Sequence, residues 1–508
     1  MTEFREIDQI ASRLSLKGRK SDGLTTGAIL EAEACEAVKA AKSDGMLDED
    51  DTAVIFQSWT VLHEYAQHLR AAFNHPNANH AIAVKTNPHS EVLKKLVSWG
   101  FGLEAASYEE LLLAEEAGID SDKLVFDGPV KRTKEINKCN ENFPRLNINI
   151  NCLQELERFP PADKCSLKIG IRLNPMVDTG APAVYHVSGD DSKFGVPISE
   201  REAILDAILK YNITTLHVHA GSSMKYLEQS TLAVKKVVDL ALEANALLAQ
   251  KCDRRINTID MGGGLLPEIL SEKAMAYSRL KTEKERFEAS NSGEAVSTMH
   301  AYAIMLRKEV PELFTDFALI TEFGQWVHFH CGFAVSEIEY VVTKKNKDIM
   351  YVHLGADYFM RDVYTGKSRS LTMQILDGWN SGLKGILTPS VSDTENCAER
   401  ERGTLYDVAG PLCVAGDYLR KDLRFIGANS DGEQPSAVAE GDMLLMLGSG
   451  SNSYGMWSRH CSRTIPKVIG VSTLGPDSTA NSNNAAEAPA PALTLMSPRW
   501  NPFVQGAV

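Results

Sequence analysis

The sequence predicts an α/β fold: a (β/α)8 TIM barrel followed by a C-terminal β-domain with sandwich-like or barrel-like packing. Short apolar runs alternate with segments of helical periodicity, which is typical of βαβ units and a parallel sheet. About eight such units occupy roughly 280 residues, and this suits a closed barrel better than an open sheet. After Glu322, β-rich segments follow one another without helices between them, which indicates a separate β-domain.

The expected elements follow the chain in order. Barrel strands are expected at 52–57, 81–84, 102–106, 123–126, 146–150, 166–173, 214–219, 258–261 and 317–321, with helices such as 59–73, 90–99 and 108–117 between them. Strands of the β-domain are expected at 326–343, 348–354, 403–408, 442–447 and 467–471. The chain then divides into an N-terminal extension (1–51) packed with the β-domain, a barrel (52–324), a β-domain (325–472) and a low-complexity tail (473–508). The tail is rich in Ala, Ser, Asn and Pro, a composition that favours disorder.

Composition narrows the function classes. The 508 residues are 44% hydrophobic and 24% charged, as in a soluble globular protein. The net charge of −14 opposes binding to nucleic acid or to an anionic membrane. No apolar run is long enough to span a bilayer, and the first twenty or so residues lack the apolar core of a secretory signal. The nine cysteines have no paired or metal-binding spacing, so we expect a reducing compartment, the cytoplasm, and no metal.

A lysine follows the apolar strand 81–84 and stands just before the turn signal Asn87-Pro88. A lysine at the end of a buried strand is costly unless its charge is used or neutralised. Lys85 can therefore have a lowered pKa and act as an amine nucleophile that forms a Schiff base with a carbonyl. The alternative is an ordinary lysine whose ammonium group reaches water.

Chemistry in a (β/α)8 barrel lies at the carboxyl ends of the strands. His219 follows one strand, the triplet 262–264 (Gly-Gly-Gly) follows the next, and Glu322 follows a third. The glycines can form an amide nest for phosphate, or they can form a flexible turn. His219 can stack on a planar cofactor, or it can be an ordinary hydrogen-bonded histidine. Glu322 can pair with a ring nitrogen, or it can lie on the surface. A lysine, a phosphate nest, a stacking ring and a carboxylate are together what pyridoxal phosphate requires.

Seven motifs between about residues 52 and 471 carry a family resemblance. They are Ala83-Val84-Lys85-Thr86-Asn87, Ser192-Lys193-Phe194-Gly195, His217-Val218-His219-Ala220-Gly221-Ser222, Asp260-Met261-Gly262-Gly263-Gly264, Glu322-Phe323-Gly324, Gly410-Pro411-Leu412-Cys413 with Gly416-Asp417, and Gly441-Asp442. The chain resembles the pyridoxal-phosphate decarboxylases of the alanine-racemase-like fold (fold type III), which act on diaminopimelate, ornithine or arginine. The diaminopimelate branch looks nearest.

The resemblance implies a role for each matching residue. Lys85 would form the internal aldimine, His219 would stack on the pyridine ring, and Glu322 would keep the ring nitrogen protonated. Ser222, Gly262, Gly263 and Gly264 would hold the phosphate, and Arg172 would contact the phosphate side or form a structural ion pair. Cys413 would come from the partner subunit of a head-to-tail homodimer and reprotonate the quinonoid carbon as a general acid. The alternative for Cys413 is a small buried apolar residue.

The departures from the family pattern concern the substrate. The usual Glu-Pro-Gly-Arg is here Glu322-Phe323-Gly324-Gln325, and the usual acidic residue after the cysteine is Val414. Arg361 still offers a guanidinium to a substrate carboxylate, and Asp417 is also expected on the substrate side. The usual phosphate-side tyrosine is replaced either by Asn452 or by a shifted Tyr454.

Val414 and Gln325 remove both usual charged contacts to the far end of the substrate. We therefore expect meso-diaminopimelate and ornithine to be poor substrates, and an amino acid or conjugate with another side chain to be preferred. Two other functions remain open: an amino-acid racemase or epimerase on the same fold, and a cofactor-free, decarboxylase-like regulatory protein. Glu322 favours decarboxylation over racemisation, because racemases of this type set an arginine against the pyridine nitrogen.

Overall fold

The computed structural model describes residues 25–268, 297–345, 347–364, 371–380, 382–389, 404–427, 437–472 and 491–500. These residues form two compact units. The barrel unit is the described part of Glu64–Val327, and the β-unit is the described part of Leu24–His63 together with His328–Val508. The β-unit therefore takes chain from both sides of the barrel unit in sequence.

The barrel unit contains, among its described residues, a closed ring of eight parallel strands, which confirms the predicted TIM barrel. In ring order the strands are β2 (Ala78–Ala83), β3 (Gly102–Ala105), β4 (Leu124–Phe126), β5 (Asn147–Ile150), β6 (Lys168–Asn174), β8 (Ile213–Val218), β9 (Thr258–Asp260) and β10 (Ala318–Thr321). Pairing of β10 with β2 and of β5 with β6 completes the ring, and the short β7 (Val196–Pro197) adds to the outer end of β6.

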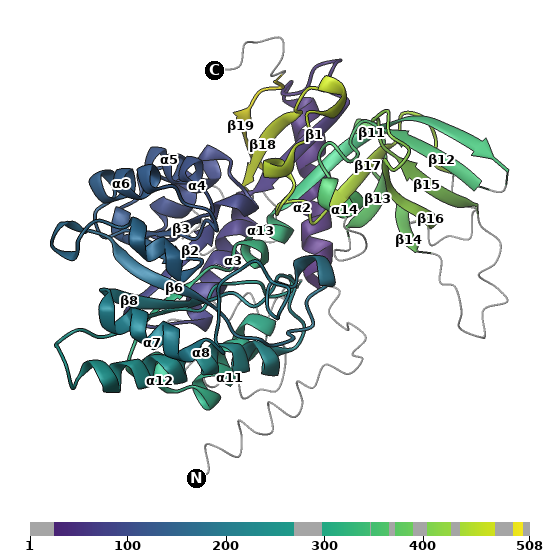
Figure 1. Ribbon diagram of the computed structural model, residues 1–508. Coiled ribbons are helices and arrows are strands. Elements are labelled where there is room, and N and C mark those ends of the chain that lie inside the picture. Colours follow the sequence, from purple (N-terminus) through teal and green to yellow (C-terminus); the bar gives the residue numbers. More distant parts are fainter. Residues whose placement is uncertain are drawn as a thin grey trace, which may run out of the picture. The chain divides into compact units, whose positions relative to one another are not determined.

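Helices follow most of these strands, and α4, α5 and α6 lie outside β2 and β3 (Figure 1). The helices of this part of the chain are α3 (Trp59–Ala72), α4 (Ser90–Ser98), α5 (Tyr108–Glu116), α6 (Thr133–Asn142), α7 (Arg201–Lys210), α8 (Leu227–Leu248), α11 (Thr298–Glu309), α12 (Glu312–Thr315) and α13 (Gly324–His328). Local sequence fixes where they begin. Ser107 caps α5 by accepting a hydrogen bond from the Glu110 amide, and His89 caps α4 in the same way from Glu91.

The β-unit contains, in its described part, a second closed sheet of seven strands that is barrel-like. These strands are β11 (Gly332–Lys344), β12 (Lys347–Val352), β15 (Leu405–Ala409), β16 (Tyr418–Gly427), β14 (Gly382–Pro389), β13 (Thr372–Asp377) and β17 (Met443–Leu447), with α14 (Met360–Tyr364) between β12 and β13. Beyond β11 the sheet continues through β1 (Ala53–Ser58), β18 (Lys467–Ser472) and β19 (Ala492–Ser497). Helix α2 (Thr25–Ser43) packs Ala34, Ala37, Val38 and Ala41 into an apolar cluster on this extension.

Three expected elements differ from the structure. The strand predicted at 52–57 as part of the barrel is β1, which pairs with β11 and β18 of the β-unit. All six of its residues are buried, so its pattern does not distinguish the two sheets. Residues 326–331, predicted as strand, form the end of α13 and a 3-10 turn, because a short apolar run fits a buried helix equally well.

The predicted tail also contains ordered structure. Strand β19 pairs antiparallel with β18, and Trp500 makes a β-bridge with Ile465. Residues 473–490 and 501–508 of the predicted tail lie outside the described residues. Among the described helices, none combines the length and the apolar composition needed to cross a bilayer.

Candidate active site

Lys85 stands on a single 3-10 turn, Val84–Thr86, that follows directly on β2. The Thr86 hydroxyl closes this turn by donating a 2.6 Å hydrogen bond to the Ala83 carbonyl. The Lys85 ammonium forms an ion pair with the Glu104 carboxylate of β3, the neighbouring strand. A side chain on Gly324 would clash with the Thr86 hydroxyl, so glycine there allows the segment after β10 to approach the Lys85 turn.

The pKa of Lys85 shifts in the direction opposite to the one that its position at a strand end suggested. Partial removal from water disfavours the ammonium charge, but the carboxylates of Glu104, Glu322 and Asp127 outweigh this effect and raise the pKa of Lys85. The side chain is 50% exposed, so the amine remains within reach of a ligand. A reactant that uses this amine as a nucleophile must first remove its proton or weaken the surrounding negative charge.

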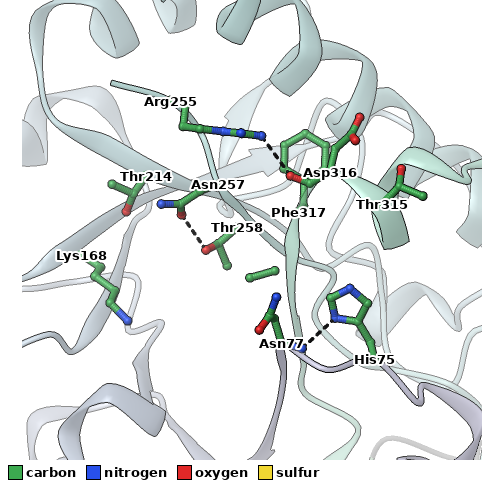
Figure 2. A pocket seen from close by; sticks show the side chains of 11 residues that line it. His75, Asn77, Lys168, Thr214, Arg255, Asn257, Thr258, Thr315, Asp316 and Phe317 are labelled. Carbon is green, nitrogen blue, oxygen red and sulfur yellow. Dashed lines mark hydrogen bonds between the residues drawn. The ribbon is translucent and has the colours of Figure 1, made fainter. Parts of the chain in front are cut away.

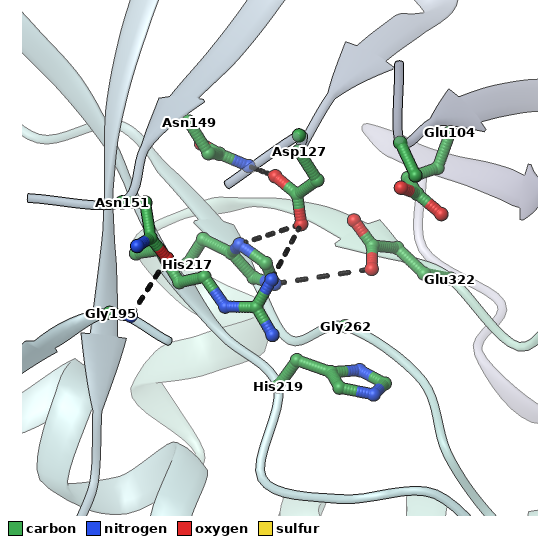
Figure 3. Close-up of polar contacts among 12 residues, drawn as sticks. Glu104, Asp127, Asn149, Asn151, Gly195, His217, His219, Gly262 and Glu322 are labelled. Atoms are coloured by element: carbon green, nitrogen blue, oxygen red, sulfur yellow. Dashed lines mark hydrogen bonds and ion pairs between the residues drawn. The ribbon is translucent and has the colours of Figure 1, made fainter. Parts of the chain in front are cut away.

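A buried polar network includes Asp127 and Glu322, the two other carboxyl groups that act on Lys85 (Figure 3). Asp127 Oδ2 lies 3.0 Å from His217 Nδ1, and His217 Nε2 lies 3.9 Å from Glu322 Oε2. The Asn149 amide donates hydrogen bonds of 2.7 Å to Asp127 and 3.2 Å to Asp260. All five side chains are buried, so their charges act in a medium of low dielectric constant.

The three carboxyl groups of this network respond differently to burial. Burial raises the pKa of Glu322 well above its usual range, and the nearby Asp260 and Asp127 raise it further. Burial also raises the pKa of Asp260, to about 6. For Asp127 burial acts in the same direction, but His217 and Arg172 outweigh it and hold its pKa below the usual value. Asp127 is therefore the anion, and Glu322 holds a proton that a neighbouring basic nitrogen can share.

The glycine triplet connects the loops after β8, β9 and β10. Gly262 (φ 63°) and Gly264 (φ 99°) adopt left-handed backbone conformations, which favour glycine. A Cβ on Gly263 would lie 2.2 Å from the Glu322 carbonyl oxygen, and a Cβ on Gly264 would lie 1.8 Å from the Gly221 carbonyl oxygen. Residues with side chains at these positions would force the loops apart, so the triplet is a packed turn between two strand ends.

His219 contacts this triplet through its ring. The Gly263 amide donates a 3.1 Å hydrogen bond to His219 Nδ1, which places the proton of a neutral ring on Nε2. Burial, together with the positive charges of Arg172 and Lys85, lowers the pKa of His219 well below its usual value. A flat, uncharged imidazole thus stands at the barrel mouth, as stacking on a cofactor ring requires.

Arg172 forms an ion pair, and its predicted contact with the phosphate side stays a prediction. Its guanidinium lies 4.0 Å from Asp127 and stacks on the Phe194 ring at 4.5 Å. The loop that carries Phe194 is fixed by a 2.9 Å hydrogen bond from the Gly195 amide to Asn151 Oδ1 (Figure 3).

Gln325 is buried and donates a 3.1 Å hydrogen bond to the Ser223 hydroxyl. Ser222 precedes Ser223 in the chain and is half-buried, and its backbone amide donates a hydrogen bond to the Tyr185 carbonyl. Gln325 therefore supports the loop that carries Ser222, and its contact with a substrate stays a prediction.

The remaining predicted site residues lie in the β-unit. Cys413 and Val414 are exposed on the loop between β15 and β16. Asp417 is buried, and its two carboxylate oxygens accept hydrogen bonds from the amides of Ala356 (2.6 Å) and Leu412 (2.7 Å). These contacts give Asp417 a positioning role in the Cys413 loop, and a direct substrate contact stays a prediction.

Arg361, Asn452 and Tyr454 also belong to the β-unit. Arg361 is buried on α14, and Asn452 has a left-handed backbone (φ 54°) with its amide donating to the Ser451 hydroxyl. Tyr454 begins a 3-10 turn, and burial raises the pKa of its hydroxyl. Their roles toward phosphate or substrate stay predictions.

Four polar residues of the barrel site were not predicted from the sequence: Glu104, Asp127, His217 and Asp260. Each stands within, or directly after, a short strand of the barrel. A charged side chain at such a position is costly unless it is paired. Its presence in the sequence could therefore have indicated a functional residue. Ligand atoms of Asp127, His217, Asp260 and Glu322 also lie within 4.8 Å of one another, a spacing that could hold a metal ion where the sequence predicted none.

A cavity of about 500 Å³ opens at the other end of the same barrel (Figure 2). Residues at the starts of strands line it, including Lys168 of β6, Thr214 of β8 and Thr258 of β9. The side chains that carry the chemistry stand at the opposite strand ends, so this cavity is not the candidate active site.

Comparison with known proteins agrees with this geometry. Residues 62–322 match the model of the pyridoxal-dependent decarboxylase family, pyridoxal binding domain. The chain is 24% identical over 394 residues to the L-glutamyl-[BtrI acyl-carrier protein] decarboxylase of Niallia circulans, covering 76% of this chain and 80% of that protein. It is also 24% identical over 437 residues to the diaminopimelate decarboxylase of Archaeoglobus fulgidus, covering 84% and 89%.

Solved structures share the fold. The diaminopimelate decarboxylase of Helicobacter pylori, complexed with L-lysine, aligns with a TM-score of 0.65 at 20% identity, covering 90% of this chain and 96% of that one. The arginine decarboxylase of Paramecium bursaria Chlorella virus aligns with a TM-score of 0.61 at 15% identity, covering 84% and 96%.

Proposed function

Since the chain belongs to the pyridoxal-dependent decarboxylase family, we propose that it decarboxylates an amino acid, or a conjugate of one, without a charged group at the distal end. The observation that carries this proposal is the pair of uncharged side chains at the two usual recognition positions. Gln325 is neutral and already bonded to Ser223, and Val414 is apolar and 39% exposed. Neither can neutralise a distal ammonium or carboxylate, so a substrate that carries one would lose binding energy.

The barrel residues fit pyridoxal 5'-phosphate, the cofactor of this family. A buried oxygen of Glu322 has no hydrogen-bond partner among the described residues, so it can accept a bond from a ring nitrogen. We assign Lys85 to hold the cofactor, His219 to stack on its ring, Ser222 and the triplet to bind its phosphate, and Glu322 to bond the ring nitrogen. When bound, the cofactor supplies an electron sink for the bond that loses carbon dioxide.

The protein's own groups then control protons. Glu322 holds a proton at its carboxyl until a ring nitrogen shares it, because burial and two neighbouring carboxyl groups oppose a second buried negative charge. Asp127 orients His217 through the 3.0 Å contact, and His217 in turn faces Glu322. We assign Cys413, from a second copy of the chain, to return a proton to the α-carbon, and Arg361 to hold a substrate carboxylate. A thiol suits this task because its ordinary pKa is near neutrality.

Two further parts of the proposal concern assembly and compartment. A Cys413 supplied by a second copy requires a homodimer with shared active sites. We also propose a cytoplasmic location, which is supported by the lack of any paired or metal-binding spacing among the nine cysteines of the sequence.

Several of the similar relatives are named diaminopimelate decarboxylases, and one is named for a different substrate. The Niallia circulans relative acts, by its name, on a glutamyl group attached to an acyl-carrier protein. In such a conjugate the far end of the glutamyl group is bonded to the carrier, so no free distal charge remains. An apolar Val414 suits this kind of substrate better than an acidic residue would.

A panel of substrates tests the proposal. Carbon dioxide release is measured with meso-diaminopimelate, ornithine, arginine, free glutamate and a γ-glutamyl thioester of pantetheine. We expect kcat/KM for diaminopimelate and ornithine to lie roughly 100-fold or more below that of the best substrate. Val414→Glu should raise turnover of ornithine and lower that of the conjugate. Efficient turnover of diaminopimelate by the unmodified protein would contradict the proposal.

A further inference from the structure

Two exposed thiols lie next to one another in the β-unit. Cys413 belongs to the loop between β15 and β16, and Cys461 belongs to the turn His460–Ser462. The backbone amide of Cys413 donates to Cys461 Sγ at 3.4 Å. Both cysteines are free and exposed in the single chain that the structure describes.

This contact limits the separation of the two residues. With standard bond lengths, a nitrogen–sulfur distance of 3.4 Å puts the two Cα atoms no more than about 8 Å apart. Disulfides join Cα atoms that are roughly 4.4–6.8 Å apart. A side-chain rotation with a small shift of one turn therefore suffices to bring the sulfur atoms to bonding distance.

The two thiol-bearing turns are also fixed to the same short segment, Gly355–Asp357. The Ala356 amide donates to Asp417, which holds the Cys413 loop, at 2.6 Å. On the other side the Ser458 amide donates to the Asp357 carbonyl at 2.8 Å, and the Arg463 guanidinium contacts the Asp357 carboxylate at 3.1 Å. This shared attachment keeps the two turns side by side, so the pairing of Cys413 with Cys461 does not depend on a chance encounter of two mobile loops.

We propose that Cys413 and Cys461 form a reversible intrachain disulfide when the protein meets a low-molecular-weight disulfide such as oxidised glutathione. The two thiols give up two protons and two electrons and form one S–S bond, while the S–S bond of the oxidant is cleaved to two thiols. The bond removes the Cys413 thiol as a proton donor, so it is a redox switch on turnover. This consequence rests on the proposed function of Cys413, whereas formation of the bond does not.

Peptide mapping tests the bond directly. The full-length, cofactor-loaded protein is equilibrated in buffers of reduced and oxidised glutathione, alkylated, digested without reductant and analysed by mass spectrometry. We expect a cross-linked pair of peptides that contain Cys413 and Cys461 and that dithiothreitol separates. Decarboxylation should fall roughly 100-fold in step with the cross-link and return on reduction.

Two variants serve as controls. Cys461→Ser should keep the activity of the reduced protein and resist inactivation through this cross-link. Cys152→Ser, which removes an exposed thiol of the barrel unit, should still form the Cys413–Cys461 bond. The proposal is overturned if Cys413 pairs with another cysteine or with glutathione instead, or if the cross-linked protein stays fully active. If the reduced protein decarboxylates no amino acid at all, the proposed function fails, and the peptide map still decides whether the bond forms.

Discussion

In the barrel unit the acidic residues of the candidate site are buried, whereas in the β-unit Cys413 and Val414 are exposed on a loop. Asp127, Asp260 and Glu322 are almost inaccessible to solvent, and each has a shifted pKa. The exposed loop is held instead by backbone hydrogen bonds to the buried Asp417.

This difference shows two ways of preparing a reactive group. Burial changes the affinity of a carboxyl or amine for its proton, and the effect persists for any ligand that enters. Backbone hydrogen bonds fix the position of the Cys413 loop, and the side chains of Cys413 and Val414 stay exposed. We therefore expect substitutions in the barrel unit to change cofactor chemistry and proton equilibria, and substitutions in the Cys413 loop to change mainly one proton transfer and substrate choice.

The largest effect is expected for Lys85→Ala. Removal of the amine eliminates the covalent attachment point, so kcat should fall by roughly 10⁴-fold or more. The cofactor should also no longer be captured covalently on borohydride reduction, which mass spectrometry of the intact protein measures. Lys85→Arg keeps the charge beside Glu104 without the nucleophile and should be equally inactive. Turnover and cofactor capture that survive in either variant would contradict the assignment.

The next effect is expected for Glu322→Gln, which cannot carry the negative charge that pairs with a protonated ring nitrogen. We expect kcat to fall by roughly 10²–10³-fold, as when a preorganised electrostatic contact is lost, with a changed absorbance spectrum of the bound cofactor. Glu268→Gln is a matched control: burial also raises the pKa of Glu268, to about 6, but its carboxylate is bonded to Thr298. Equal losses in the two variants would show that any buried carboxyl group matters, not this one.

Cys413→Ala should lower kcat roughly 100-fold, within the range of general acid catalysis. Because the side chain is exposed, the variant should keep the thermal stability and the cofactor spectrum of the unmodified protein. Cofactor binding measured by fluorescence and turnover measured by carbon dioxide release separate these effects. If Cys413→Ala lost cofactor binding as strongly as Glu322→Gln does, the Cys413 loop would affect the cofactor as the barrel residues do. That result would contradict the expected difference between the two units.

Glu104→Gln should have a smaller effect, on the pKa of Lys85. Glu104 makes the largest of the contributions that raise this pKa, so its removal lowers the pKa and increases the fraction of neutral amine near pH 8. One unit of pKa corresponds to about a tenfold faster reaction of the apoprotein with an aldehyde. The pH dependence of pyridoxal capture by the apoprotein measures this shift. An unchanged pH profile would mean that the ion pair does not control the amine.

The last prediction concerns acid stability, not catalysis, and involves His80 of β2. Burial lowers the pKa of His80 to about 4, so the folded barrel holds a neutral ring bonded to Thr321. As pH falls below about 6.5, His80 becomes protonated in the unfolded chain but stays neutral in the folded chain. The free energy of unfolding therefore falls by about 3 kcal/mol by pH 4. His80→Asn should reduce this loss, as measured by urea unfolding at pH 7.5 and 4.5. Parallel pH dependence in the two proteins would contradict the explanation.

The sequence alone determined the closed parallel barrel and the separate β-domain, because the alternation of short apolar strands with helices depends only on residue order. It also identified Lys85, the glycine triplet, His219 and Glu322 as candidates, since each follows a predicted strand and matches a motif of the family that the chain resembles. Only the tertiary structure decided that β1 joins the β-unit, because a strand buried on both faces fits either sheet. Only the tertiary structure placed Glu104 against Lys85 and His217 between Asp127 and Glu322. These contacts and the resulting pKa shifts depend on distances between strands that are far apart in the chain and become neighbours when the ring closes.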